Sequence, residues 1–348
     1  LMPYAAFCVL RDMNGTPDFS KWKGYAKYNK KKVEAFCADN KAEIDFWCFV
    51  QYHLDAQLSE VCSYAHGRGV IFKGDLPIGI SRTSVDAWLY PELFHMDSQA
   101  GAPPDAFSEF GQNWGFPTYN WERMAKDGFA WWKSRLAKMA EYFDAFRIDH
   151  ILGFFRIWEI PMDAVHGLLG HFNPAMPYTA DYLKSIGFDM AVTDWSKPLT
   201  YDWVLWEMFG DLAEEVKGKY IKDGVLAKGY ETQRKVAENL KGDDPKTVRI
   251  REGLMNLLDD VLFVEDPRQK GCYHPRISAQ STCSFRSLDA YRRAAFDNLY
   301  NDFFFHRHNS FWQESAMKKL PELLDSTGML ACGEDLGMIP ACVPDVMA

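Results

Sequence analysis

The sequence predicts an α/β fold built on parallel strands, and three short segments carry that prediction. Each segment has the apolar character of a buried strand and runs into an acid, at Asp75, Asp149 and Glu334. Helical patterns precede the first two segments, which is the order that parallel β/α architecture produces. In a TIM-type barrel the carboxyl ends of the strands surround one pocket, so acids far apart in the sequence converge there. The sequence therefore predicts a partial TIM (β/α)8 barrel.

The first helices are predicted from turn signals and from periodicity. A helix is expected over residues 29–39, after a loop at Asn14–Asp18. Over residues 44–67 apolar side chains recur at helical spacing, and glycine ends the pattern. Because His53 lies within this apolar pattern, we expect a packed core histidine rather than a ligand.

The first predicted strand, Val70–Pro77, contains Asp75 and leads into a long segment without strong periodicity. Asp75 can bind substrate or simply cap a turn. A loop as long as residues 81–119 is usually functional when it lies inside a compact domain, so we expect it to embrace a substrate. Three of its side chains suit ligand binding: Asp105, Gln112 and Trp114.

A helix predicted over residues 121–143 leads into the second strand, which stops at three polar residues, Arg147, Asp149 and His150. Charged side chains are rarely buried at a strand end unless they are used. Arg147 and Asp149 are two residues apart, so on a strand they project to the same face. The guanidinium would then hold the carboxylate ionised near neutral pH, as a nucleophile requires. A structural Arg–Asp pair explains the same two residues equally well.

The middle of the chain is predicted to be a largely helical insertion. Proline and glycine interrupt residues 162–200, which show few periodic runs. Helical patterns follow in three stretches, at residues 203–220, 245–264 and 287–324.

The third strand, Met329–Gly333, follows this insertion and ends at Glu334. We therefore expect a catalytic barrel that is interrupted once and then resumes. Its predicted parts are residues 1–161 for the first part of the barrel, 162–325 for the insertion and 326–348 for the continued, truncated barrel.

Composition narrows the classes of function. Lysine and arginine total 39 against 48 acidic residues, which gives a net charge of −9. This acidic balance, without a long basic run, argues against nucleic acid or an anionic membrane as a partner. Aromatic residues make up 15% of the chain, and sugar-binding clefts use such flat apolar surfaces with polar rims.

Cysteine usage and hydropathy indicate the compartment. The eight cysteines form no Cys-x-x-Cys pair and no histidine lies at metal-ligand spacing, so we expect free thiols and no metal site. No apolar run approaches the roughly 18 residues of a membrane span, and no signal-like segment opens the chain. We expect a soluble, cytoplasmic protein. Gly67-Arg68-Gly69 precedes a strand instead of opening a helix, which argues against a nicotinamide or phosphate cofactor.

Two converging carboxylates, one ionised and one protonated, are the groups that cleave a glycosidic bond through an oxocarbenium-like transition state. The residues around the predicted acids also resemble a known family, glycoside hydrolase family 77, the 4-α-glucanotransferases that include amylomaltase and the disproportionating enzymes. The stretch between the two acids is similar to the insertion of the disproportionating enzyme 2 subgroup. Five segments carry the resemblance: Gly74–Gly79, Gly101–Asp105, Gly111–Gly115, Phe146–Pro161 and Gly333–Gly337.

The resemblance implies roles for individual residues. Asp149 matches the catalytic nucleophile and Glu334 the general acid/base, while Arg147 and His150 match residues that contact the sugar. It also implies a TIM barrel, a retaining mechanism and no cofactor, with maltose, malto-oligosaccharides and glycogen- or starch-like glucans as substrates. Four further residues lie on matching substrate-loop motifs: Asp75, Asp105, Gln112 and Trp114.

One departure from the family concerns a third essential acid, in a His-Asp motif on a later strand, which has no counterpart in this sequence. A barrel also requires eight strands where three are predicted. We therefore expect a central fragment of a larger enzyme, inactive on its own. Two other functions stay open: an α-glucan hydrolase with the same carboxylates, and a non-catalytic glucan-binding protein.

Overall fold

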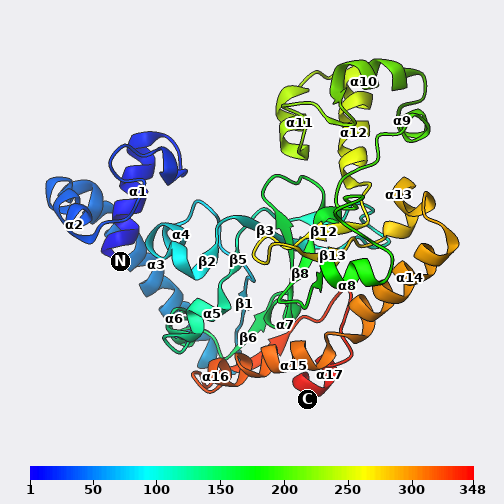
Figure 1. Ribbon diagram of the computed structural model, residues 1–348. Coiled ribbons are helices and arrows are strands. Elements are labelled where there is room, and N and C mark those ends of the chain that lie inside the picture. Colours follow the sequence, from blue (N-terminus) through cyan, green and yellow to red (C-terminus); the bar gives the residue numbers. More distant parts are fainter.

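The computed structural model describes residues 1–348 and is organised around a parallel sheet in the order β1-β6-β14 (Figure 1). Leu76 of β1 and Gly333 of β14 both pair with Ile148 of β6, so the three strands end at the same level. The predicted α/β class and its three parallel strands are therefore confirmed. Their bounds are Lys73–Leu76 for β1, Ala145–Ile148 for β6 and Leu330–Gly333 for β14.

Helices precede each strand of this sheet, as predicted, but the helix before β6 is interrupted. The helix expected over residues 121–143 is divided at Gly128 and Phe129, which have φ values of 66° and 60°. A non-glycine residue with positive φ cannot continue a helix. The helices that precede the strands are α3 (Lys41–His66), α5 (Trp121–Ala125), α6 (Ala130–Met139), α15 (Asn309–Met317) and α16 (Leu320–Leu324).

The segment expected to be a long loop is instead largely ordered, which corrects the prediction for residues 81–119. Within it, β3 pairs with β7, and β4 and β8 complete a four-stranded antiparallel sheet. Sequence reasoning missed β3 because its Ser-Gln-Ala-Gly-Ala sequence has no β-branched or aromatic residue. The elements are α4 (Val85–Leu89), β2 (Phe94–His95), β3 (Ser98–Ala102), β4 (Gln112–Asn113), β5 (Thr118–Tyr119), β7 (Ile157–Pro161) and β8 (His171–Asn173).

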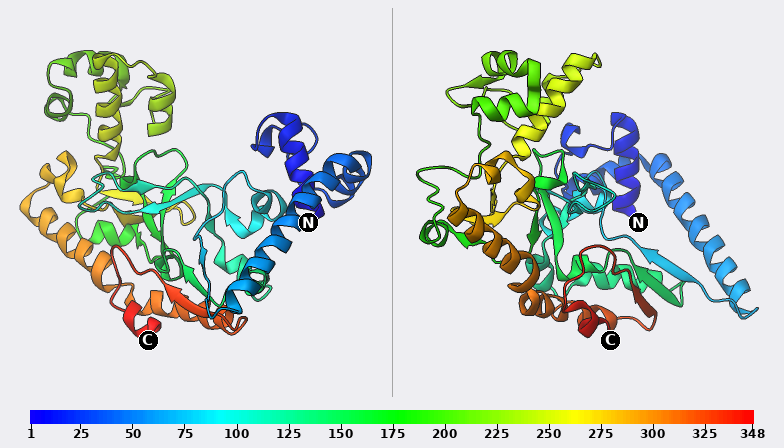
Figure 2. Two further views of the ribbon diagram at one scale, coloured as in Figure 1. Left: turned by 180° about the vertical axis from the view of Figure 1, so that it is seen from behind. Right: turned by 90° about the vertical axis from the view of Figure 1, so that its right-hand side faces the viewer.

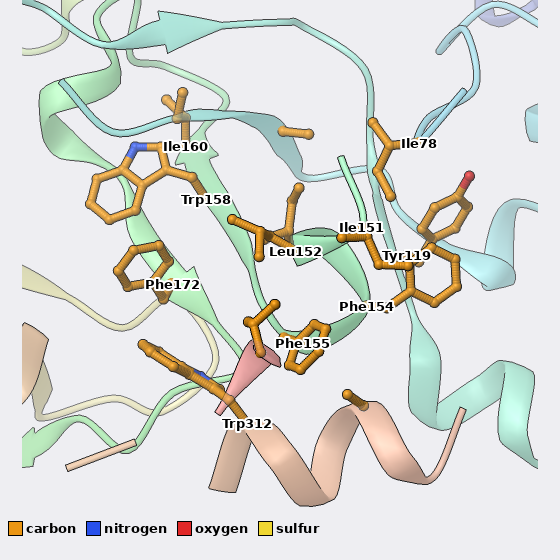
Figure 3. Packing of buried hydrophobic residues seen from close by; sticks show 14 of the residues in the cluster. Ile78, Tyr119, Ile151, Leu152, Phe154, Phe155, Trp158, Ile160, Phe172 and Trp312 are labelled. Carbon is orange, nitrogen blue, oxygen red and sulfur yellow. The ribbon is translucent and has the colours of Figure 1, made fainter. Parts of the chain in front are cut away.

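The main core lies directly beneath the carboxyl end of β6. The short helix α7 (Leu152–Phe155) begins just after this strand and buries Phe154 and Phe155 completely. Figure 3 shows these rings packed with residues of β7, β8 and α15. The residues at the end of β6 are thus attached to a rigid apolar base.

A helical lobe projects from the body of the molecule (Figures 1 and 2). It has its own apolar core, in which Val216 and Leu254 are fully buried. The predicted helix at 203–220 is divided into two, and the one at 245–264 ends at Asp259. We define the lobe by four helices, α9 (Asp202–Phe209), α10 (Ala213–Tyr220), α11 (Gln233–Asn239) and α12 (Pro245–Asp259).

The remainder of residues 162–325 packs on the main core, to which Leu168, Phe263 and Phe296 contribute. The domain boundaries at 161/162 and 325/326 stay a prediction. Two small antiparallel sheets occur here, β9-β13-β12 and β10-β11. The remaining elements are α8 (Ala180–Ser185), α13 (Cys283–Arg286), α14 (Ala290–Asn301), α17 (Val343–Met347), β9 (Tyr178–Thr179), β10 (Ile221–Lys222), β11 (Val225–Leu226), β12 (Phe263–Glu265) and β13 (Cys272–Pro275).

The N-terminal helices α1 (Met2–Asn14) and α2 (Lys30–Asp39) pack against the first part of α3. The helix predicted over 29–39 is confirmed, and the side chain of Asn29 caps it by accepting from the N–H of Lys32. His53 is exposed, so the expectation of a core histidine is wrong; its ring lies 4.2 Å from that of Phe49, which is itself 60% exposed. No helix combines the length and the apolar character that crossing a bilayer requires.

Candidate active site

Asp149 and Glu334 are the first residues after β6 and β14, and the backbone fixes both of them. The N–H of Asp149 donates to the carbonyl of Leu76, and the N–H of Glu334 donates to the carbonyl of Ile148, each at 3.0 Å. The hydrogen-bond ladder of the sheet therefore continues one residue beyond the strands. The two acids emerge from neighbouring strands at the same edge of the sheet.

His150 joins the two strand ends through its backbone. It has a φ of 51°, which is uncommon for a residue with a side chain, and its N–H donates to Oε2 of Glu334 at 2.9 Å. The carbonyl of Glu334 accepts from the N–H of Ile151 at 3.0 Å. The turn after β6 therefore fixes the position of the Glu334 carboxylate.

Arg147 links all three strand-end acids. Its Nη1 contacts both carboxylate oxygens of Asp75, at 2.8 and 2.9 Å. Its Nη2 lies 3.1 Å from Oδ1 of Asp149 and 2.8 Å from Oε1 of Glu334. These two oxygens can be no further apart than the sum of the last two distances. The two carboxyl groups are also close enough for each to shift the pKa of the other.

Burial, hydrogen bonds and charges shift the pKa values of the two acids in opposite directions. Burial and the neighbouring Glu334 carboxylate raise the pKa of Asp149. The N–H of His150 and the Arg147 guanidinium lower the pKa of Glu334, although burial opposes them. Arg147 lowers the pKa of both acids, but it divides its charge among three carboxylates and its nearer contact is with Glu334, so the net shift of the Asp149 pKa is upward. In this structure a proton shared by the pair resides mainly on Asp149.

A cleft of about 1090 Å³ opens beside the two acids and contains most of the predicted site residues. Arg147 and Asp75 lie outside its lining, behind the acids, so the structure does not place Arg147 where it was expected to touch a sugar. Six predicted residues line the cleft: Asp105, Gln112, Trp114, Asp149, His150 and Glu334.

Trp114 supplies a flat aromatic wall of the cleft. Its ring stacks on Phe116 at 5.7 Å and meets the edge of the His150 ring at 5.1 Å. Its Nε1 donates to Oε1 of Gln112 at 2.9 Å, which fixes the amide and the indole together. An aromatic face with an adjoining amide matches the apolar face and polar rim of a sugar ring.

A family model described as 4-alpha-glucanotransferase, glycoside hydrolase family 77, matches residues 1–348. The chain belongs to this family. The rice (Oryza sativa subsp. japonica) 4-alpha-glucanotransferase DPE2 is 44% identical over 365 residues, a match that covers 100% of this chain and 38% of the rice protein. A 4-alpha-glucanotransferase of Chlamydia pneumoniae is 37% identical over 185 residues, which cover 53% of this chain and 34% of that protein.

The chain thus spans well under half the length of these two relatives. Among solved structures, amylomaltase from Streptococcus agalactiae in complex with acarbose is similar with a TM-score of 0.48 and 20% identity, covering 87% of this chain and 72% of that chain.

Asp105 has a structural task in this family 77 chain as well as a place in the cleft. Its Oδ1 accepts from the N–H groups of Phe107 and Ser108, each at 2.8 Å, and so fixes a turn at the lip of the cleft. The turn presents Phe107, which is 99% exposed, to solvent at the cleft entrance. Sequence reasoning named Asp105 but missed this phenylalanine, which no periodic pattern marks.

Arg156 is a second residue of the cleft that sequence reasoning missed. Its side chain is buried, with the guanidinium 4.0 Å from the ring centre of Phe172 and 4.9 Å from that of Trp312. Burial lowers its pKa to about 9. Burial, followed by the nearby Arg156 charge, lowers the pKa of His150 to about 4, so the imidazole is neutral at pH 7. A lone arginine inside the aromatic run from Phe154 to Trp158 is the signal that could have identified it.

The group of side chains best placed to hold a metal ion lies away from the cleft. His171, Asp266 and His274 offer ligand atoms within 4.8 Å of one another. Nε2 of His274 is 2.9 Å from Oδ2 of Asp266, so these two side chains are hydrogen-bonded directly to each other. None of these three residues lines the cleft.

Proposed function

We propose that this family 77 chain carries the two catalytic carboxylates of a retaining 4-α-glucanotransferase. The observation that supports this most is the contact of Asp149 and Glu334 with a single guanidinium nitrogen, at 3.1 and 2.8 Å, at the edge of an aromatic cleft. Two carboxylates this close suit a double displacement, in which no water has to fit between one acid and the sugar.

In the first step, a carboxylate oxygen of Asp149 attacks C1 of the donor glucose. The bond from C1 to the glycosidic oxygen breaks, and that oxygen takes the proton of Glu334 as the leaving chain departs. The product is a glucosyl ester of Asp149. Arg147 contacts both acids without lining the cleft, and stabilises the charge that moves between them.

In the second step, the 4-hydroxyl of an acceptor glucan gives its proton to the Glu334 carboxylate and its oxygen attacks C1. The ester bond breaks, and Asp149 leaves as a carboxylate. Retention of the α configuration follows from two inversions. We infer that Trp114 and Gln112 hold the sugar rings, and that His150 contributes as a neutral hydrogen-bonding group, because its pKa is lowered to about 4.

The first step requires the proton on Glu334, whereas the free site favours it on Asp149. We infer that a bound donor reverses this order. A glycosidic oxygen that hydrogen-bonds to Glu334 competes with the His150 N–H, and loss of that N–H contact raises the pKa of Glu334. Arg147 then turns its charge toward Asp149, which lowers the pKa of the nucleophile.

The substrates that we propose are maltose or malto-oligosaccharides as donors and glycogen- or starch-like glucans as acceptors, with no cofactor. Similarity to 4-alpha-glucanotransferases over the whole chain and the aromatic, amide-lined cleft support this class. Transfer and plain hydrolysis differ in the acceptor, which is a glucan in transfer and water in hydrolysis. The assay should therefore compare chain-lengthened products with free reducing ends.

The roles of the two acids are tested in the protein that contains this chain. With Asp149→Asn no glucosyl-enzyme should form from a donor with an activated leaving group, as judged by intact mass. With Glu334→Gln the same donor should load Asp149, whereas turnover of maltose should fall by about 10²- to 10⁴-fold. Asp335→Asn is the matched control, because this neighbouring carboxylate is exposed and lies outside the cleft lining. Maltose turnover by Glu334→Gln within a few-fold of the control would contradict the assignment.

A further inference from the structure

A second hollow, of about 560 Å³, lies where the helical lobe meets the body of the molecule. Met208 of α9 and Asn256 of α12 form its lobe side. Pro104 and Asp105 line both this hollow and the catalytic cleft, so the two share one loop as a wall. We call it the lobe groove. A polymer held in the cleft has only this loop to cross to reach the lobe groove.

Buried acids make the floor of the lobe groove rigid. Asp259 is hydrogen-bonded to Gln233 at 2.8 Å and to the His166 ring at 2.6 Å. Asp260 accepts from the N–H groups of Cys283 and Ser284, at 2.7 and 2.8 Å. Because these carboxylates already have partners, they are not a vacant cation site.

One nitrogen of a buried arginine on the wall of the lobe groove lacks a hydrogen-bond partner. Arg276 is 4% exposed and lines the lobe groove. Its Nη1 donates to the carbonyls of Ile277 and Ser278, whereas its Nε has no hydrogen-bond partner. A buried donor left without a partner is costly unless a ligand or water satisfies it. The positive charge of Arg276 lies near the carboxylates of Asp259 and Asp260. The lobe groove as a whole therefore does not attract an anion.

The rim supplies groups that recognise hydroxyls. The exposed amide of Asn256 makes no hydrogen bond within the protein, and the exposed Ser278 and Ser281 lie opposite it. Phe110 is 39% exposed, and its ring is held 4.5 Å from the ring of His166. Amide and hydroxyl groups beside a fixed aromatic face suit a neutral, polyhydroxylated ligand.

We propose that the lobe groove is a second glucan-binding site, which holds a part of a polymeric glucan distant from the reacting bond. This inference rests on the proposed function, because it gives the same substrate a second point of attachment. Binding at two sites on one molecule raises the effective concentration of the chain at the cleft, and therefore favours long glucans over maltose.

The test measures the affinity for glycogen of the protein that contains this chain, by affinity electrophoresis. Asn256→Trp fills the lobe groove from the exposed face of α12, and should weaken glycogen binding by about tenfold. Ser281→Trp acts from the opposite rim and should have the same effect. Glu252→Trp is the matched control, since this residue is exposed on the same helix but outside the groove. Thermal melting curves confirm that all three variants are folded.

A cleft variant separates the failure of this inference from that of the proposed function. Trp114→Ala should weaken glycogen binding independently, so that the double variant with Asn256→Trp binds more weakly than either single variant. If Trp114→Ala weakens binding but Asn256→Trp and Ser281→Trp match Glu252→Trp, the lobe groove is not a glucan site while the proposed function stands. If the unaltered protein does not bind glycogen at all, the proposed substrate class and the lobe groove are both wrong.

Discussion

The carboxyl edge of the parallel sheet and the helical lobe are built by opposite means. At the sheet edge, three strands aligned by their backbone ladder bring Asp149 and Glu334 to one guanidinium, and the fully buried Phe154 supports the turn between them. In the lobe, α9, α10 and α12 bury mainly apolar side chains, and the buried acid at the end of α12, Asp259, is held by Gln233 and His166. The sheet edge therefore depends on charged groups held in fixed positions, whereas the lobe depends on apolar packing that keeps its surface in place. Perturbing the two regions should therefore have separable effects.

The largest effect is expected at the arginine that joins the acids. Arg147→Met keeps the length of the side chain but leaves three carboxylates facing one another without a cation. Removing one fixed electrostatic partner of a transition state typically lowers kcat by about 10²- to 10³-fold. We expect that loss in kcat/KM for maltose in the protein that contains this chain. Arg249→Met in the lobe, which breaks an exposed pair with Asp211, should leave kcat/KM unchanged.

The second comparison sets one buried apolar residue of each region against the other. Phe154 in the main core and Leu254 in the lobe are both 0% exposed. Phe154→Ala should destabilise the body by about 3–5 kcal/mol and also lower activity, because α7 follows the Asp149 turn directly. Leu254→Ala should destabilise the lobe by about 2–5 kcal/mol with little change in maltose turnover. Urea unfolding gives the loss of stability of each variant, and kinetics with maltose give its loss of activity. An equal loss of activity in the two variants would show that the lobe and the catalytic site are coupled.

Acid should also act on the two regions differently. Burial is the main cause that lowers the pKa of His150 and His308 to about 4 and that of His171 to about 3. The helical lobe, residues 202–259, contains no histidine. In the unfolded chain these rings bind protons below about pH 6.5, while in the folded chain they stay neutral down to about pH 4. Stability therefore rises with pH across this window and is lost as pH falls from about 6.5 to 4, by up to about 3 kcal/mol for His150 alone.

Hydrogen exchange at pH 7 and pH 5, corrected for the intrinsic effect of pH, measures this. Peptides of the body should lose protection at pH 5 before peptides of the lobe do. Earlier opening of α9 to α12 at pH 5 would contradict the assignment of the acid-sensitive groups to the body.

The same contrast explains which parts of the structure were predictable from the sequence. The ends of β1, β6 and β14 were predicted because an apolar run that stops at an acid is a local signal. The family resemblance carried the roles of Asp149 and Glu334. The preference of the shared proton for Asp149 was not predictable, because it depends on Arg147 contacts with Asp75 on one neighbouring strand and Glu334 on the other.

Three other features depend on contacts that no short segment reveals. The strand β3 is formed by small residues that pair with β7, almost sixty residues later, so its conformation comes from its partner rather than from its own propensity. The helix α3 was predicted correctly, but whether His53 would be buried depended on neighbours that its periodicity does not specify. The lobe groove joins residues of five separate segments, around Phe110, Leu168, Met208, Asn256 and Ser281, none of which forms a motif.

The smallest effect is expected from a helix cap in the lobe. The hydroxyl of Thr232 accepts a hydrogen bond from the N–H of Lys235 at the start of α11, and so satisfies one of the free N–H groups there. Thr232→Ala should destabilise the lobe by about 1 kcal/mol, whereas Thr232→Ser should restore most of the loss. Neither change should alter glucosyl transfer from maltose, since α11 contributes no residue to the catalytic cleft. A shift of the pH profile of transfer in Thr232→Ala, with recovery in Thr232→Ser, would show that lobe stability reaches the Asp149–Glu334 pair and would end the separation of the two regions.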